Sequence, residues 1–131
     1  SVVSIALAEF QAAMEELGVA DCVTTFTASD FGRTLTSNGN GNDHAWGGNV
    51  MVMGDSVNGG QIFGEYPSLA LGGADDVGGA ILLPTISTDE YFAELSRWFG
   101  VSSGDLSYVL PNVGRFYDPA SSSLPIGFMN V

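Results

Sequence analysis

The architecture is easiest to infer from residues 22–34, which read Cys22-Val23-Thr24-Thr25-Phe26-Thr27-Ala28-Ser29-Asp30-Phe31-Gly32-Arg33-Thr34. The first six residues are rich in β-branched side chains and predict a short strand. The Ser, Asp and Gly that follow favour a turn where this strand ends. In open α/β sheets, ligands bind beyond the carboxyl ends of the strands, so we expect the functional groups in this segment.

An amphipathic helix is predicted before this strand. Apolar side chains recur there at alternating steps of four and three, which is the spacing of a helix with one apolar stripe. They are Val3, Leu7, Phe10, Met14 and Leu17. Gly18 follows in the position favoured for a left-handed helix cap. A helix, a short link and a strand form the second half of an α/β unit, so the sequence predicts an α/β fold.

The middle of the chain predicts loops and short strands. Residues 37–49 contain two Asn-Gly dipeptides and a Gly pair and are expected to form a loop. Residues 49–53 and 61–64 predict short strands, and residues 80–84 predict either a short strand or a buried extended segment.

Two further helices are expected near the end of the chain. Ser87 and Glu90 match a capping box, so a helix should begin there and end at Gly100, with Trp98 and Phe99 in the core. A short third helix is expected within residues 103–110, because Pro111 would end it.

The composition suggests a surface that other polypeptide covers. The 131 residues are the length of one domain, yet only 14% are charged. A surface rich in Gly, Ser, Asn and Thr would explain this equally simply, but we favour coverage by further protein. The net charge of −12, with three Lys or Arg, argues against binding to nucleic acid or to acidic membrane surfaces.

Other classes of site find little support. Cys22 is the one cysteine, so neither an intrachain disulfide nor a cysteine metal motif can form, and its apolar surroundings predict a buried, inert thiol. No apolar run is long enough to span a membrane. The chain begins without Met and directly in a helical pattern, so we expect that the natural protein extends upstream.

Four polar residues form the candidate site. Asp30 suits a metal ligand, or it caps its own turn. His44, with Asp43 beside it, suits a metal ligand or an acid–base group, or it is a hydrogen-bonded structural residue. Arg33 either holds a phosphate, sulfate or carboxylate group or forms an ion pair with one of the two aspartates.

These segments resemble a bacterial family, domain-of-unknown-function family 1501. The likeness rests on three segments: Ala28-Ser29-Asp30-Phe31-Gly32-Arg33-Thr34, then Asn38-Gly39-Asn40-Gly41, and Asp43-His44-Ala45-Trp46-Gly47-Gly48. Residues 59–64, 84–85, 91–99 and 111–116 are similar to later parts of the family. The likeness is to the C-terminal end of a longer protein, so residues 1–131 are interpreted as a single C-terminal segment of a larger α/β domain.

The resemblance carries expectations about fold and function. Members of the family look like distant relatives of the alkaline phosphatase and sulfatase superfamily, and many have export signals of the twin-arginine type. This implies part of an alkaline-phosphatase-like α/β/α sandwich, incomplete without upstream polypeptide, in an exported bacterial protein, periplasmic or extracellular. The implied activity is metal-dependent hydrolysis of phosphate or sulfate esters, with zinc, calcium or manganese as the divalent metal.

The resemblance also assigns roles to individual residues. Asp30 matches an acidic metal ligand, His44 matches a later histidine ligand with Asp43 beside it, and Arg33 would orient the anionic ester. Phe31 stands where the superfamily has a second histidine. The alternative is therefore a catalytically degenerate relative that acts as a surface, assembly or ligand-binding protein. The implied partners are the upstream part of the same protein or a companion chain, and a homo-oligomer is a further possibility.

Overall fold

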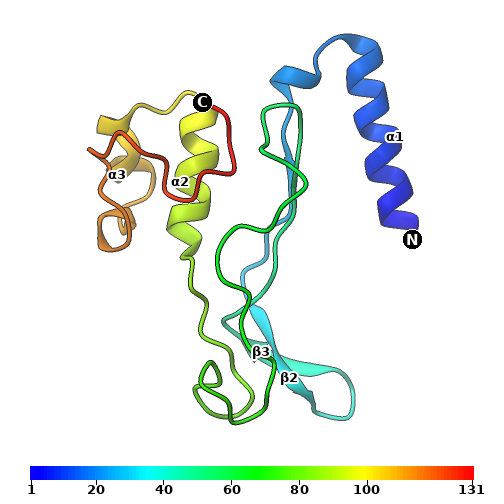
Figure 1. The fold of residues 1–131 in the computed structure, drawn as a ribbon, viewed down its shortest axis with the longest axis vertical. Helices are drawn as coiled ribbons and strands as arrows, with labels where there is room; N and C mark the ends of the chain where they lie inside the picture. The colour runs from blue at the N-terminus through cyan, green and yellow to red at the C-terminus, as the bar shows by residue number, and fades with distance from the viewer.

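The structure is a computed structural model that describes residues 1–131, and it combines helices with two small antiparallel sheets (Figure 1). The helices are α1 (Val2–Leu17), α2 (Thr88–Trp98) and α3 (Leu106–Val109), with 3-10 turns η1 (Ala20–Cys22), η2 (Ser103–Asp105) and η3 (Val113–Arg115). The strands are β1 (Thr25–Phe26), β2 (Gly32–Ser37), β3 (Asn42–Ala45) and β4 (Val52–Met53). In Figure 1, α1 stands at one side and the β2–β3 hairpin lies at the far end, while α2 and α3 lie side by side and α2 packs against the β1–β4 region.

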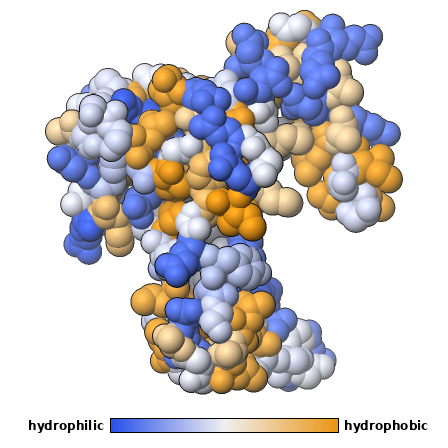
Figure 2. Space-filling model, viewed as in Figure 1, coloured by the Kyte–Doolittle hydropathy of each residue, from blue (hydrophilic) through white to orange (hydrophobic).

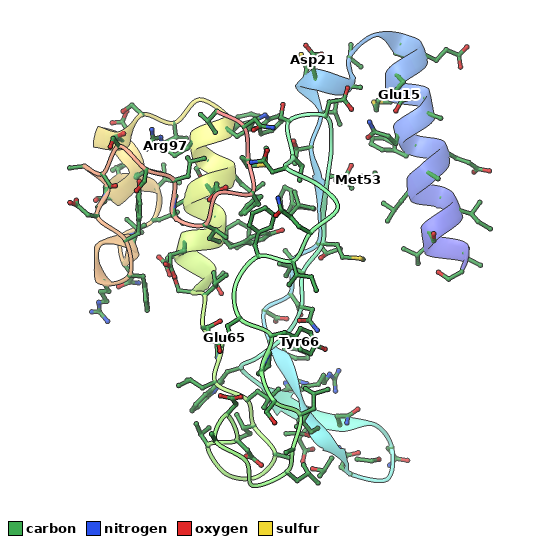
Figure 3. All side chains as sticks on the ribbon, viewed as in Figure 1. Glu15, Asp21, Met53, Glu65, Tyr66 and Arg97 are labelled. Carbon is green, nitrogen blue, oxygen red and sulfur yellow. The ribbon has the colours of Figure 1, made fainter.

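Helix α1 forms as predicted, but its apolar stripe is only partly covered: Leu7 and Met14 are half-buried, and the other three stripe residues are exposed. Gly18 ends the helix in the left-handed conformation, with φ 69°. No residue of α1 is buried, and Figure 2 shows apolar side chains gathered on its free end. The helix contacts its own chain through Gln11, whose Nε2 donates to Asp55 Oδ1 at 2.9 Å, and through Leu7, which borders a small hollow beside Met53 (Figure 3). Most of the stripe therefore faces away from the rest of the protein.

The strand predicted over residues 22–27 is shorter than expected. Cys22 lies in η1, and only Thr25 and Phe26 pair with β4, in the register Thr25↔Met53 and Phe26↔Val52. The prediction of a buried thiol is wrong, because Cys22 is exposed. A hydrogen bond to the neighbouring Asp21 carboxylate, together with its negative charge, raises the pKa of this thiol. The thiol is therefore kept protonated rather than activated.

The predicted loop over residues 37–49 is wrong at Ser37, which ends β2, and at residues 42–45, which form β3; the two strands pair as an antiparallel hairpin. The pairs are Gly32↔Ala45, Arg33↔His44 and Ser37↔Asn42, with an irregular register between the last two. The Asn-Gly turns occur as expected at the hairpin tip, where the Asn38 N–H donates to the Gly41 carbonyl oxygen at 2.9 Å. The strands carry few apolar residues, so they lack the alternation that would have indicated them.

The remaining short strands were predicted with mixed success. Residues 49–53 contribute only the two residues of β4, and residues 61–64 form no strand, which corrects that prediction. In residues 80–84 the chain forms a single bridge, between Leu82 and Asp76, and both Ala80 and Leu82 are buried. The expectation of a buried extended segment is therefore met only at Leu82, because Ala80 lies in a turn with a φ of 62° and Leu83 is exposed.

Helix α2 organises the core. Its capping box is confirmed, with the Glu90 N–H donating to Ser87 Oγ and the Ser87 N–H donating to Glu90 Oε2. One core cluster on α2 contains Tyr91, Leu95, Phe128 and Met129, and the other contains Ala93, Leu106 and Val113. Trp98 packs partly buried against the first cluster, whereas Phe99 is 83% exposed, so the prediction that both lie in the core is wrong for Phe99.

Little of the chain is enclosed. Only 13 of 131 residues are buried, and the exposed apolar side chains include several of α1 and of the β1–β4 region. Exposed apolar surface of this kind is typical of interaction sites.

None of the helices combines the length and apolarity required to cross a membrane.

Candidate functional site

The β2–β3 hairpin brings together the two basic residues that the sequence singled out. Arg33 and His44 are direct cross-strand partners. Directly opposed residues of an antiparallel pair project from the same face, so the two side chains share one face of the hairpin. Both are exposed. The hairpin therefore presents a guanidinium and an imidazole side by side to solvent.

Phe31 holds this pair in place. Its ring stacks on the His44 imidazole, with centroids 3.5 Å apart and an interplanar angle of 11°. The Arg33 Cζ lies 5.0 Å from the centroid of the same ring, within cation–π range. We call Phe31, Arg33 and His44 the Phe31 cluster. From the sequence, Phe31 was noted only as a departure from the superfamily. Its position two residues before Arg33 was the one sequence feature that could have suggested contact with the Arg33 side chain.

A hydrogen bond to the backbone orients Arg33. Arg33 Nη1 donates to the carbonyl oxygen of Asn42 at 2.6 Å, across the hairpin. The Asn42 side chain in turn donates to the carbonyl oxygens of Thr34 and Thr36, at 2.9 Å and 3.1 Å. Arg33 is thus fixed by a carbonyl oxygen rather than by the carboxylate of Asp30 or Asp43. Its charge is not neutralised by that contact and is available to an anion.

Asp43 and His44 do not converge on one point. Neighbouring residues of a strand project to opposite faces, so the Asp43 carboxylate lies on the face opposite the imidazole. Its Oδ1 accepts a hydrogen bond from Asn38 Nδ2 at 2.7 Å, and its backbone N–H donates to the hydroxyl of buried Thr34 at 3.2 Å. Asp43 therefore has a structural role in the hairpin.

The chain does not assemble a metal centre by itself. Asp30 is exposed at the bend before β2, and no three His, Cys, Asp or Glu side chains anywhere in residues 1–131 lie close enough to hold a metal ion. The predicted ligands Asp30, Asp43 and His44 consequently do not fit a metal without further donors from outside this chain.

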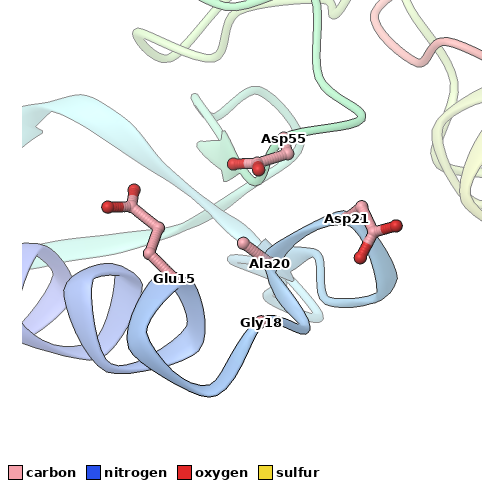
Figure 4. A pocket seen from close by; sticks show the side chains of 5 residues that line it. All are labelled: Glu15, Gly18, Ala20, Asp21 and Asp55. Carbon is pink, nitrogen blue, oxygen red and sulfur yellow. The ribbon is translucent and has the colours of Figure 1, made fainter.

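An acidic hollow lies elsewhere, at the C-terminal end of α1 (Figure 4). It is open and is lined by Glu15, Gly18, Ala20, Asp21 and Asp55. The negative end of the α1 dipole adds to the charge of its three carboxylates. These carboxylates are not grouped as metal ligands, so the hollow is an acidic surface feature.

Comparison with known proteins identifies the family. No curated protein and no solved structure matches the chain significantly. Residues 2–106 match the family described as "Protein of unknown function (DUF1501)". The matched region contains α1, both sheets and α2, which is most of the chain, including the Phe31 cluster. The chain therefore belongs to the DUF1501 family.

Proposed function

We propose that this chain is the C-terminal segment of an exported, hydrolase-like protein that acts on phosphate or sulfate esters, and that the Phe31 cluster binds the anionic group of the ester. The observation that carries the proposal is the pairing of Arg33 with His44 on one exposed face, supported by the ring of Phe31. The resemblance to relatives of alkaline phosphatases and sulfatases supplies the class of ester and the expected α/β/α sandwich.

The electrostatics of the chain favour an anion at this position. The sequence has fifteen Asp or Glu against three Lys or Arg, so a tetrahedral oxyanion would be repelled by most of the surface. The Phe31 cluster is where a guanidinium and an imidazole occur together. A guanidinium offers a planar fork of N–H donors that matches two oxygens of phosphate or sulfate, and the imidazole adds one further donor.

The role of these residues is to bind and orient the ester. Arg33 would donate to the nonbridging oxygens, while the stack on Phe31 holds the imidazole plane of His44 in a fixed orientation. The resemblance implies a divalent metal, which would activate water or polarise the ester when bound. Because the ligands in this chain do not form a complete set, such an ion and the nucleophile would depend on polypeptide outside these residues.

The exposed apolar surfaces support the proposal of a larger protein. A lone domain of this size normally encloses its apolar helix stripe, whereas α1 buries none of its residues. We therefore propose that upstream polypeptide, or a companion chain, covers α1 and completes the sandwich. The export of this protein to the periplasm or beyond rests on the family resemblance.

Arg33→Lys is expected to weaken the binding of inorganic phosphate and sulfate about tenfold, because lysine cannot form the two-pronged contact. Binding is measured by following backbone and His44 side-chain NMR signals during titration with either anion. Arg115→Lys is the matched control, since Arg115 is also exposed but lies in η3. Equal anion affinity in both variants, or shifts that do not include the hairpin, would count against the proposal.

A second function is favoured by the position of Phe31. Its ring covers one face of His44 at the place where the superfamily has another histidine, which suits a relative that binds a ligand without catalysis. Measurements on the full-length protein distinguish the two proposed functions. Stoichiometric metal by mass spectrometry, lost in His44→Ala, together with hydrolysis of aryl phosphates or sulfates, supports the hydrolase. Anion binding without metal or turnover supports the degenerate relative.

A further inference from the structure

Trp46 is an exposed aromatic residue directly beside the Phe31 cluster. It follows Ala45, the last residue of β3, and its side chain is 64% exposed. No other aromatic ring of the chain packs against its indole. Trp is enriched where proteins contact ligands and partners, because its large ring buries much surface in a single contact. The free indole next to two basic side chains is therefore a candidate contact for the same ligand.

The register of the hairpin places Trp46 on the same face as the Phe31 cluster. Ala45 pairs with Gly32, so continuing this register by one residue sets Trp46 opposite Phe31. Residues two apart in an extended chain project from the same face, which places Trp46 beside His44. The pattern of burial agrees, because Ala45 is 5% exposed while the residues on either side of it are exposed. Trp46 and the Phe31 cluster thus share the side of the hairpin that faces solvent.

The backbone on both sides of Trp46 is closely packed. Ala45 is buried, and Gly47 lies between Gly32 and Leu82. A Cβ at Gly47 would lie 3.0 Å from the Leu82 carbonyl oxygen, and a Cβ at Gly32 would overlap the carbonyl oxygen of Gly47. The position from which the indole projects is consequently fixed. Because a Trp side chain has only two rotatable angles, little conformational entropy is lost when it binds a ligand.

An indole beside an anion-binding pair suits a ligand with a ring next to its charged group. The face of an indole carries partial negative charge and stacks on other aromatic rings. The C–H groups of a sugar ring, which carry partial positive charge, pack against the same face. An acyclic ester has no flat face to offer, so the indole would add little to its binding.

We propose that Trp46 is the ring-binding part of the site, so that the ester bound at the Phe31 cluster carries its phosphate or sulfate on an aromatic or sugar ring. This inference rests on the proposed function, because Arg33 and His44 must hold the anion for Trp46 to contact the ring attached to it. Trp46 then determines specificity, by favouring ring esters over acyclic ones. It takes no part in breaking the ester bond.

The test compares ligands that share one charged group. The full chain is titrated with inorganic phosphate, glycerol phosphate, glucose 1-phosphate and phenyl phosphate, and binding is followed by NMR. At least one of the two ring esters is expected to bind about tenfold more tightly than glycerol phosphate. Whichever ring gives the larger gain identifies the ring as aromatic or sugar. Trp46→Ala is expected to remove the gain and to leave the affinity for inorganic phosphate unchanged.

Two further variants and a direct contact measurement complete the test. Trp46→Phe keeps a ring and should retain part of the gain. Tyr108→Ala is the matched control, because Tyr108 is 90% exposed but lies in α3, so all four affinities should stay the same. Nuclear Overhauser effects between the ring protons of the ligand and the indole protons of Trp46 are expected in the unmodified chain, where no substitution can disturb the fold.

The possible failures are distinguishable. Equal affinities for ring and acyclic esters, or a preference for ring esters that survives Trp46→Ala, would overturn the role of Trp46 while the anion site remains. Inorganic phosphate that does not bind at the hairpin would overturn the proposed function, and this inference with it.

Discussion

The free energy of unfolding is expected to fall by about 2–4 kcal/mol in Glu94→Gln, the largest effect we expect from a change that preserves side-chain size. The carboxylate of Glu94 accepts three main-chain hydrogen bonds in a fully buried position. A carboxamide keeps one acceptor oxygen and directs an NH2 group at the remaining donors, so at least one buried N–H is left without a partner. Urea denaturation followed by circular dichroism measures the change.

Glu9→Gln on α1 is the matched control. Glu9 is exposed on a helix with no buried residue, so the same chemical change should alter stability by no more than about 0.5 kcal/mol. Similar stability of Glu94→Gln and Glu9→Gln would show that the hydrogen bonds of Glu94 to Ile126, Gly127 and Met129 do not stabilise the folded chain.

Gly32→Ala is expected to destabilise the hairpin by about 2–4 kcal/mol and to abolish anion binding at the Phe31 cluster. A Cβ at position 32 would overlap the carbonyl oxygen of Gly47. Because this is a backbone atom, no change of side-chain rotamer can relieve the overlap. Gly32 pairs with Ala45 at the base of the hairpin, directly before the Arg33↔His44 pair. Amide hydrogen exchange in β2 and β3, together with the phosphate titration, measures the effect.

Gly114→Ala provides the control, because no heavy atom lies within 4 Å of a Cβ there. Its φ is not positive, so alanine is expected to be neutral or slightly stabilising. Unchanged protection of the β2 and β3 amides in Gly32→Ala would contradict this account of the hairpin. The same overlap gives a physical reason for glycine between Phe31 and Arg33.

The helices could be predicted because their signals are local. The apolar stripe and Gly18 define α1, and the Ser87 and Glu90 pair defines the start of α2. The β2–β3 hairpin could not be predicted in this way, because its strands are mostly polar and its pairing depends on register. The buried, hydrogen-bonded position of Glu94 could not be predicted either, because its partners Ile126, Gly127 and Met129 are 32 to 35 residues away in sequence.

The candidate site was predictable in part. The closeness of Arg33 and His44 follows from two basic residues in one short polar segment, and the structure places them opposite each other. The resemblance suggested Asp43 and His44 together as metal ligands, but adjacency in a strand separates their side chains onto opposite faces. The stack of Phe31 on His44 depends on cross-strand geometry, which a sequence does not display.

The attachment of α1 has a consequence for how the protein is assembled. Helix α1 contacts the rest of the chain through one side-chain hydrogen bond, from Gln11 to Asp55, and through the apolar side chain of Leu7 beside Met53. So few contacts constrain the orientation of α1 only weakly. A surface that buries the apolar stripe would therefore determine the direction of the helix axis. If the proposed upstream polypeptide or companion chain docks on α1, the same contact would bury the apolar stripe and set the orientation of the helix.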